Sequence, residues 1–144
     1  MIIVSACLAG LNTRYDGADC LDSRVAALVS SGEAIAVCPE QLGGLATPRS
    51  PVELRRNYNQ GTKTGDIYVI GSDGKDYTSA LIKGALETLK LAAKLNIRKA
   101  IFKDGSPSCG VNYIWCSGHK ISGRGITTEL LQKNNIEIIT IDSI

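Results

Sequence analysis

The chain has 144 residues, of which 44% are hydrophobic and 21% charged, a composition typical of one globular domain with a substantial core. Sixteen Lys and Arg and fourteen Asp and Glu residues give a formal net charge of +2, and these charges are spread along the chain. The pattern does not indicate a polyanion-binding surface, so nucleic acid is not an expected partner. No apolar stretch reaches the ~18 residues of a membrane span, so we expect no membrane segment.

The first residues, MIIVSACLAG, have no basic segment before their apolar run, which favours a first strand over a signal peptide. We therefore expect a cytoplasmic protein. The chain has five cysteines, and in a reducing compartment this odd number points to metal binding or catalysis rather than to disulfides.

Short apolar runs alternate along the chain with segments of helical periodicity. The predicted elements, in chain order, are a strand over 2–6, a helix between an N-cap at Asp22 and a stop at Gly32, a strand over 34–38, an irregular stretch from Pro39, a β-hairpin from 52–58 and 66–70, a helix over 77–95, a strand over 99–103, a loop from Gly105 to Gly125, a helix over 127–135 capped by Thr127, and a strand over 136–141. Alternating strands and helices predict right-handed crossovers and a parallel sheet. We therefore expect residues 1–144 to form one α/β domain, a Rossmann-like three-layer fold with a mainly parallel sheet of about four strands.

Three cysteines stand where a predicted strand ends and a glycine- or proline-bearing loop begins: Cys7 in SACLAG, Cys38 in AVCPE and Cys109 in SPSCG. The predicted helix-to-strand links are a few residues long, whereas each strand-to-helix loop exceeds a dozen residues. Loops of that length in compact domains are usually functional. Because parallel strands end at one edge of a sheet, we expect the three sulfur atoms to converge above the carboxyl edge, where open α/β folds bind ligands.

Three converging thiolates form a soft ligand set that suits zinc, copper(I) or an iron-sulfur cluster. A structural zinc site needs a fourth protein ligand, and the remaining candidates are Cys20, Cys116 and His119. We expect Cys20 to be a small apolar filler before a helix, and the CxxH pair of Cys116 and His119 to lie outside the site. A metal site with only the three cysteines as ligands would keep one coordination position open to substrate. The spacing of the three cysteines matches no sequential metal motif, so the residues alone leave a metal site and a metal-free site both open.

Polar residues beside these cysteines are candidates for chemistry. Glu40 lies two residues beyond the second cysteine and could act as acid or base, and Ser106 and Ser108 precede the third. Each also has a structural interpretation. The carboxylate could bond loop amides or pair with Arg49, and serines in a proline turn usually satisfy backbone groups.

Charged residues in two further motifs are candidates for substrate binding. Arg14 and Asp16 occur in TRYDG, and Arg49 occurs in TPRSP. They are either surface ion pairs or, if buried beside the cysteines, groups that orient a polar substrate. We expect substrate contacts from Arg14, Asp16, Arg49 and Ser108.

Four motifs, in this order and spread over nearly the whole chain, resemble the DUF523 family, whose members include thiouracil desulfidases: SACLAG with RYDG, CPEQLGGLATPRSP, KDGSPSCG and GITTELL. In the desulfidases of that family, three cysteines bind a [4Fe-4S] cluster whose fourth iron has no protein ligand. The resemblance implies this ligand role for Cys7, Cys38 and Cys109, an acid/base role for Glu40 and a second catalytic role for Ser106. The stretch NYIWCSGHK departs most from the family pattern, and we expect it to border the pocket and affect the choice of substrate.

The resemblance implies an enzyme that removes sulfur from a small thiolated heterocycle such as thiouracil. Oxygen from water replaces the sulfur, and sulfide leaves onto the open iron. Two other functions stay open. One is amide hydrolysis with Cys109 as nucleophile, Glu40 as base and Lys103 as oxyanion partner, and the other is a non-catalytic module that binds or transfers a cluster. A homodimer is compatible with the sequence.

Overall fold

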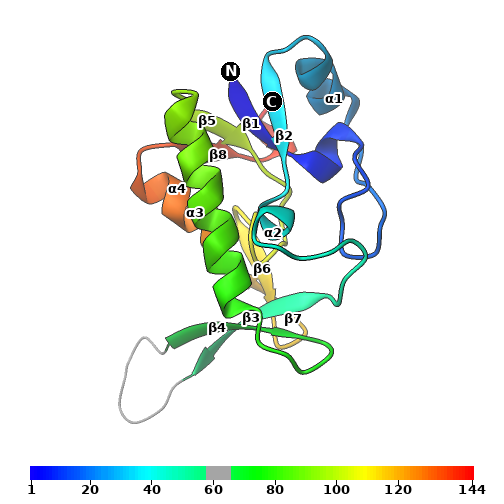
Figure 1. Cartoon of the computed structure of the whole chain (residues 1–144), viewed down its shortest axis with the longest axis vertical. Helices are drawn as coiled ribbons and strands as arrows, with labels where there is room; N and C mark the ends of the chain where they lie inside the picture. The colour runs from blue at the N-terminus through cyan, green and yellow to red at the C-terminus, as the bar shows by residue number, and fades with distance from the viewer. Residues whose placement is uncertain (58–65) are drawn as a thin grey trace.

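A parallel sheet of four short strands lies at the centre of the computed structural model, which describes residues 1–57 and 66–144. The strands are β1 (Ile2–Ser5), β2 (Ala34–Val37), β5 (Lys99–Ile101) and β8 (Glu137–Ile139), and their spatial order is β2-β1-β5-β8 (Figure 1). In the register of the sheet, Ile3 of β1 lies between Ile35 of β2 and Ala100 of β5. The prediction of a four-stranded parallel sheet in one α/β domain is confirmed.

Helices cover both faces of the sheet and give the three predicted layers (Figure 1). One face carries α1 (Ser23–Ser30) and the short 3-10 helix η1 (Ala6–Ala9), which pack against each other and against β2. The other face carries α3 (Thr78–Lys94) and α4 (Ile126–Lys133), which also pack together. A single turn, α2 (Pro39–Leu42), follows β2, and a 3-10 turn, η2 (Ile141–Ser143), ends the chain. Within 1–57 and 66–144, no helix has the length and apolar character needed to cross a bilayer.

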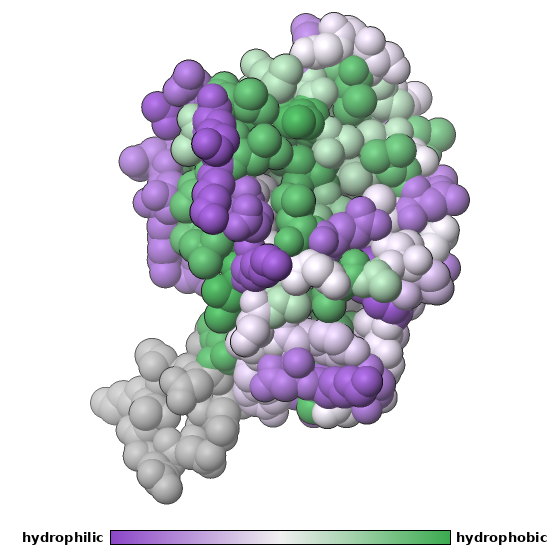
Figure 2. Space-filling view, in the orientation of Figure 1, coloured by the Kyte–Doolittle hydropathy of each residue, from purple (hydrophilic) through white to green (hydrophobic). Residues whose placement is uncertain are grey.

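Successive strand residues point to opposite faces of the sheet, so the core has two hydrophobic layers. The layer beneath α3 and α4 includes Ile3, Ala92, Ala100, Phe102 and Leu131, and the layer beneath α1 includes Val4, Leu8, Val25 and Ile101. Apolar surface also gathers over this body of the molecule, whereas the end that carries β3 and β7 is mostly weakly polar to hydrophilic (Figure 2).

Two glycines allow α2 to lie directly on α3. A Cβ atom at Gly43 would lie 2.0 Å from the Ala80 carbonyl oxygen, and one at Gly84 would lie 1.9 Å from the Pro39 carbonyl oxygen. No other residue type fits at either position without moving one backbone away from the other. The first turn after β2 is therefore held at a fixed distance from the longest helix.

Two antiparallel hairpins extend from the layered body. The predicted hairpin of β3 (Val52–Asn57) and β4 (Asp66–Gly71) is confirmed, although the prediction for Tyr58 lies outside the described residues. The second hairpin, β6 (Tyr113–Cys116) and β7 (His119–Ser122), contradicts the predicted loop from Gly105 to Gly125. Its strands are joined by Ser117 and Gly118, which have φ angles of 52° and 78°. Positive φ at both central residues matches the twist that a two-residue hairpin requires.

Several predicted boundaries also differ from the structure. The strands of the parallel sheet are one to three residues shorter than predicted. The stretch from Pro39 begins as α2 rather than as irregular chain, because proline suits the first helical position. The last helix begins at Ile126, with Gly125 and not Thr127 as its N-cap. A Cβ atom at position 125 would lie 2.4 Å from the Ser108 carbonyl oxygen, so the helix starts where the chain passes the Cys109 loop.

Candidate active site

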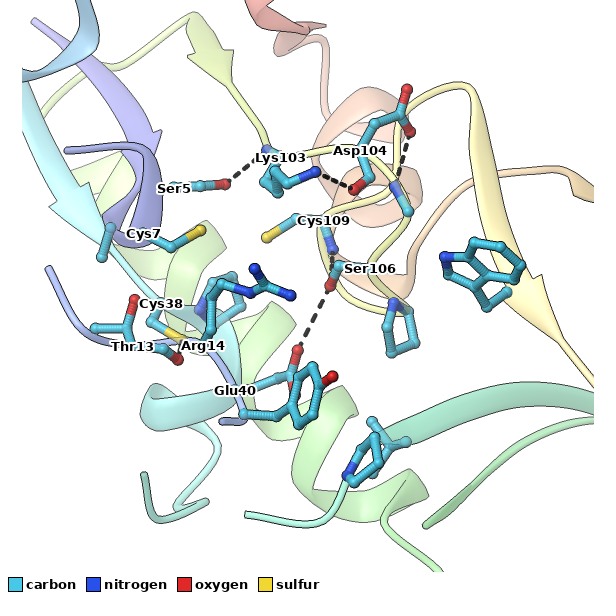
Figure 3. Close-up of a pocket in the computed structure, with 18 of the residues that line it drawn as sticks. Ser5, Cys7, Thr13, Arg14, Cys38, Glu40, Lys103, Asp104, Ser106 and Cys109 are labelled. Carbon is cyan, nitrogen blue, oxygen red and sulfur yellow. Dashed lines mark hydrogen bonds between the residues drawn. The ribbon is translucent and has the colours of Figure 1, made fainter. Parts of the chain in front are cut away.

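A cavity of about 360 Å³ opens at the carboxyl edge of the parallel sheet, where β1, β2 and β5 end (Figure 3). The loops after these three strands and residues of β3 and β6 form its walls. They supply Ser5, Cys7, Thr13, Arg14, Tyr15, Cys38, Glu40, Arg49, Glu53, Lys103, Asp104, Ser106, Cys109, Tyr113 and Trp115, among others. The long loops that the sequence singled out therefore meet at one place.

The three cysteines of these loops line the same cavity. Cys7 lies in η1 directly after β1, Cys38 is the N-cap residue of α2, and Cys109 lies in the loop after β5. Cys7 and Cys109 point toward each other across the cavity, with Cys38 below them in Figure 3. The Cys38 Sγ atom lies 3.9 Å from the Thr13 carbonyl oxygen, to which its thiol donates.

The thiols of Cys7 and Cys109 are hard to ionise without a positive partner. Burial, together with the nearby sulfurs of Cys20 and Cys38, raises the pKa of Cys7 to about 12, although Lys103 acts in the opposite direction. Burial also raises the pKa of Cys109 well above its ordinary value, although a hydrogen bond from Ser5 partly opposes the increase. A cationic ligand would therefore stabilise the thiolates of these two buried cysteines.

This set of donors fits an iron-sulfur cluster. Soft thiolates are the usual protein ligands of such clusters, and bound iron supplies the positive charge that these buried sulfurs lack. Among the residues that the structure describes, no three His, Cys, Asp or Glu side chains are close enough to share one metal ion. A cluster does not require that closeness, because each thiolate binds a different iron.

The carboxylate of Glu40 lies beside the thiols and is fixed from two sides. Its Oε2 atom accepts hydrogen bonds from the hydroxyl of Ser108 at 2.7 Å and of Ser106 at 3.4 Å. Its Oε1 atom accepts one from Nε of Arg49 at 3.2 Å, and both side chains of this ion pair are largely buried. Ser106 is itself oriented, because its Oγ accepts from the amides of Ser108 and Cys109 at 3.1 Å each. The structure thus brings together Glu40, Ser106, Ser108 and Arg49.

Arg49 also joins separate loops to one another. Its Nη2 donates to the Thr13 carbonyl oxygen at 3.0 Å, its Nη1 donates to the Thr47 hydroxyl at 2.9 Å, and its amide donates to the Tyr15 carbonyl oxygen at 2.8 Å. One guanidinium therefore holds the first loop, the second loop and the Glu40 carboxylate in a fixed arrangement.

The other charged candidates are Arg14, Asp16 and Lys103. Arg14 lines the cavity and lies 3.9 Å from Asp16, and both side chains are more than a third exposed. Asp16 is outside the cavity lining and accepts a hydrogen bond from the Ala18 amide at 3.0 Å. Lys103 lines the cavity, and its Nζ donates to the Asp104 carbonyl oxygen at 3.4 Å.

Asp104 organises the Cys109 loop, a role that was not predicted from the sequence. Its Oδ1 atom accepts from the amides of Gly105, Val111, Asn112 and Tyr113, and its Oδ2 atom accepts from the Asn112 side chain. Burial raises the pKa of Asp104, but these hydrogen bonds together outweigh burial and hold the pKa below its ordinary value. An aspartate before a glycine and a proline turn is the sequence signal that could have identified it.

The cysteines and histidine predicted to lie outside the site do not line the cavity. Cys20 packs against the core layer beneath α1, and its amide donates to the Cys7 carbonyl oxygen at 2.9 Å. Cys116 and His119 form a cross-strand pair in the second hairpin, and Cys116 lines a separate hollow.

The geometry disfavours Cys109 as the nucleophile of an amide hydrolase. A nucleophilic cysteine needs a lowered pKa and partial exposure, whereas Cys109 is buried and its pKa is raised. Among the described residues, the hydrogen bonds of Glu40, its proposed base, come from two serines and an arginine and not from this thiol.

The fold and the cavity define a small α/β protein with a thiol-lined site at the carboxyl edge of its sheet. The chain matches the family model described as 2-thiouracil desulfurase over residues 2–143. It is 36% identical over 143 residues to YbbK, an uncharacterized protein of Bacillus subtilis strain 168, covering 97% of this chain and 95% of YbbK.

A solved structure is also similar to this one. The [4Fe-4S]-dependent thiouracil desulfidase TudS shares 39% sequence identity with the chain and superposes with a TM-score of 0.84, covering 99% of this chain and 91% of TudS. The chain belongs to the 2-thiouracil desulfurase family, and the resemblance to DUF523 proteins that its motifs indicated is confirmed.

Proposed function

We propose that this protein is a [4Fe-4S]-dependent desulfidase that replaces the sulfur of a small thiolated heterocycle, of the thiouracil class, with oxygen from water. Family membership and the similarity to TudS support this activity. The observation that carries it is the oriented carboxylate of Glu40, bonded to Ser106 and Ser108 in the cavity that three thiols line.

Cys7, Cys38 and Cys109 would hold the cluster, one iron each. With only three protein thiolates, the bound cluster supplies one iron without a protein ligand, a soft Lewis acid suited to a thiocarbonyl sulfur. A reducing cytoplasm would keep these thiols available for binding.

Glu40 is the proposed general base. Its Oε2 atom, which faces the two serine hydroxyls, takes a proton from water directly or through Ser106. The water oxygen adds to the thiocarbonyl carbon, the carbon-sulfur bond of the resulting tetrahedral species then breaks, and the products are the oxo compound and hydrosulfide, with no net electron transfer. Arg49 binds Oε1, whereas Oε2 contacts the serine hydroxyls, so we assign the proton exchange to Oε2.

The remaining candidates have positioning or binding roles in this proposal. Arg14, at the cavity wall, contacts the polar groups of the substrate, and Asp16 orients Arg14. Arg49 and Ser108 affect the substrate through Glu40, to which both donate hydrogen bonds.

The test is anaerobic reconstitution followed by measurement of iron, sulfide, the visible absorption spectrum and the conversion of 2-thiouracil to uracil. We expect about four irons per chain. Glu40→Gln should keep the iron and the spectrum and lower kcat by about 10²- to 10⁴-fold, the usual contribution of a general base.

Glu129→Gln is the matched control, since Glu129 is on α4 and outside this cavity. Unchanged turnover in Glu40→Gln would exclude its proposed role. Cluster transfer to another protein without turnover of any thiouracil would favour the non-catalytic module instead.

A further inference from the structure

The strand β6 presents alternate side chains to two different hollows. Tyr113 and Trp115 line the thiol-containing cavity, whereas Ile114 is buried in the core and Cys116 lines the hollow on the other side of the hairpin. This alternation is the two-residue periodicity of a strand. The β6–β7 hairpin therefore places two aromatic rings at the cavity that holds the candidate catalytic groups.

Aromatic side chains are concentrated around this cavity. The described residues include six aromatic side chains, and three of them, Tyr15, Tyr113 and Trp115, line it. The rest of the lining combines the polar groups described above with apolar residues such as Pro51 and Val52. A planar ligand would find aromatic surface on the side of the cavity formed by β6.

The two tyrosines already have neighbours at their rings. Lys120 Nζ lies 4.0 Å from the centroid of the Tyr113 ring, and the edge of that ring closes on Gly105, where a Cβ atom would lie 2.9 Å from it. The Arg14 guanidinium lies 5.7 Å from the centroid of the Tyr15 ring. Within the part of the chain that the structure describes, the indole of Trp115 has no such cationic contact, and the residue is 47% exposed.

We infer that Trp115 binds the substrate by stacking against its ring, and that it makes the site selective for planar aromatic thioheterocycles over saturated thiocarbonyl compounds. This inference rests on the proposed function, because it assigns the ring of the desulfidase substrate to the β6 side of the cavity. Stacking on an aromatic side chain discriminates by shape and planarity, since every nucleobase has a π face. The polar groups at the thiol end then select the position of the sulfur.

The contact acts on binding rather than on the reacting bond. A ring stacks equally well before and during attack on its thiocarbonyl carbon, so loss of the indole raises KM and leaves kcat nearly unchanged. This signature differs from that of Glu40→Gln, which lowers kcat.

The kinetic test compares 2-thiouracil with dihydro-2-thiouracil, which keeps the thiocarbonyl and ring amides but loses the planar aromatic ring. Trp115→Ala should raise KM for 2-thiouracil by roughly 5- to 150-fold, as expected for loss of one base-stacking contact, and change KM for the dihydro compound by less than about 3-fold. Trp115→Phe should recover most of the loss. Ile121→Ala truncates another exposed side chain on the same hairpin and should leave KM for both substrates unchanged.

A second measurement does not depend on turnover. Trp115 is the only tryptophan in the chain, so its fluorescence in the reconstituted protein reports directly on this contact. Uracil should change the emission saturably, and dihydrouracil should do so weakly. An equal increase in KM for both substrates in Trp115→Ala, or an emission that does not change on addition of uracil, would overturn the inference. Turnover of 2-thiouracil by the wild-type protein would still support the proposed function in that case. If 2-thiouracil is not turned over but uracil changes the emission saturably and more strongly than dihydrouracil, the proposed function would be wrong and the stacking contact would stand.

Discussion

The loop after β5 and the β6–β7 hairpin are adjacent in sequence, yet they are built very differently. In the loop, Ser108, Cys109 and Gly110 are buried, and the amides around them bond to Asp104 or Ser106. Every residue of β7 is exposed, and the hairpin packs against β3 at the periphery. Ser106, Ser108 and Cys109 thus lie on a loop fixed by hydrogen bonds, whereas Trp115 lies on a peripheral hairpin whose second strand is exposed. Substitutions should therefore destabilise the protein more in the loop after β5 than in the β6–β7 hairpin.

The largest expected effect is in the constrained loop. Cys109→Ala should abolish both the visible absorption of the reconstituted protein and its desulfidase activity, because two thiolates cannot hold the cluster. Iron quantitation and a turnover assay check this, with circular dichroism to show that the variant is folded. Cys20→Ala is the matched control and should keep its iron. Full iron content in Cys109→Ala would show that the thiol set is wrongly assigned.

An intermediate effect is expected at Asp104. Asp104→Asn should destabilise the protein by on the order of 2 kcal/mol, because several amides lose a charged acceptor. Since the folded-state pKa is lowered, the charged form contributes stability above the ordinary carboxyl pKa of about 3.8, and this contribution is lost as pH falls through the folded-state pKa.

Urea denaturation at neutral pH and in acid measures this difference. The gap between wild type and Asp104→Asn should close in acid, whereas Asp19→Asn, at an exposed turn with one amide partner, should differ little from wild type at either pH. A gap that is independent of pH would mean that the charge of Asp104 is not what stabilises the loop.

The smallest effect is expected in the hairpin. Lys120→Ala removes the ammonium above the Tyr113 ring and should cost about 0.5–1 kcal/mol, the usual value for an exposed cation–π contact. Chemical denaturation measures the loss, with Lys75→Ala as a control at an exposed turn. A loss as large as that of Asp104→Asn would erase the contrast between the two regions.

The sequence predicted those parts of the fold that depend on local patterns. The four strands of the sheet are short, mainly apolar runs, and Asp22 accepts from the Arg24 amide as the predicted N-cap. Because parallel strands end at one edge, the same pattern predicted that Cys7, Cys38 and Cys109 would meet. The predicted ligand and catalytic roles of these residues and of Glu40 and Ser106 remain predictions.

The parts that the sequence did not reveal depend on contacts between distant segments. The β6–β7 hairpin was missed because its strands are short and polar on one side and its turn is Ser117-Gly118 rather than a stronger turn pair. The interaction of Arg49 with Thr13, 36 residues away, has no local signature. Gly125 replaces Thr127 as the cap because of its close approach to Ser108, which no periodicity encodes.

The contact between Gly43 and Gly84 links a helix remote from the cavity to the carboxylate within it. Since α2 carries Glu40 and lies against α3 with no room for one more methyl group, the two helices form a single packing unit. Under the proposed mechanism, a substitution at position 84 should displace α2 and impair proton transfer by Glu40, although Gly84 does not line the cavity. Any transplantation of this chemistry to another scaffold has to carry both helices together.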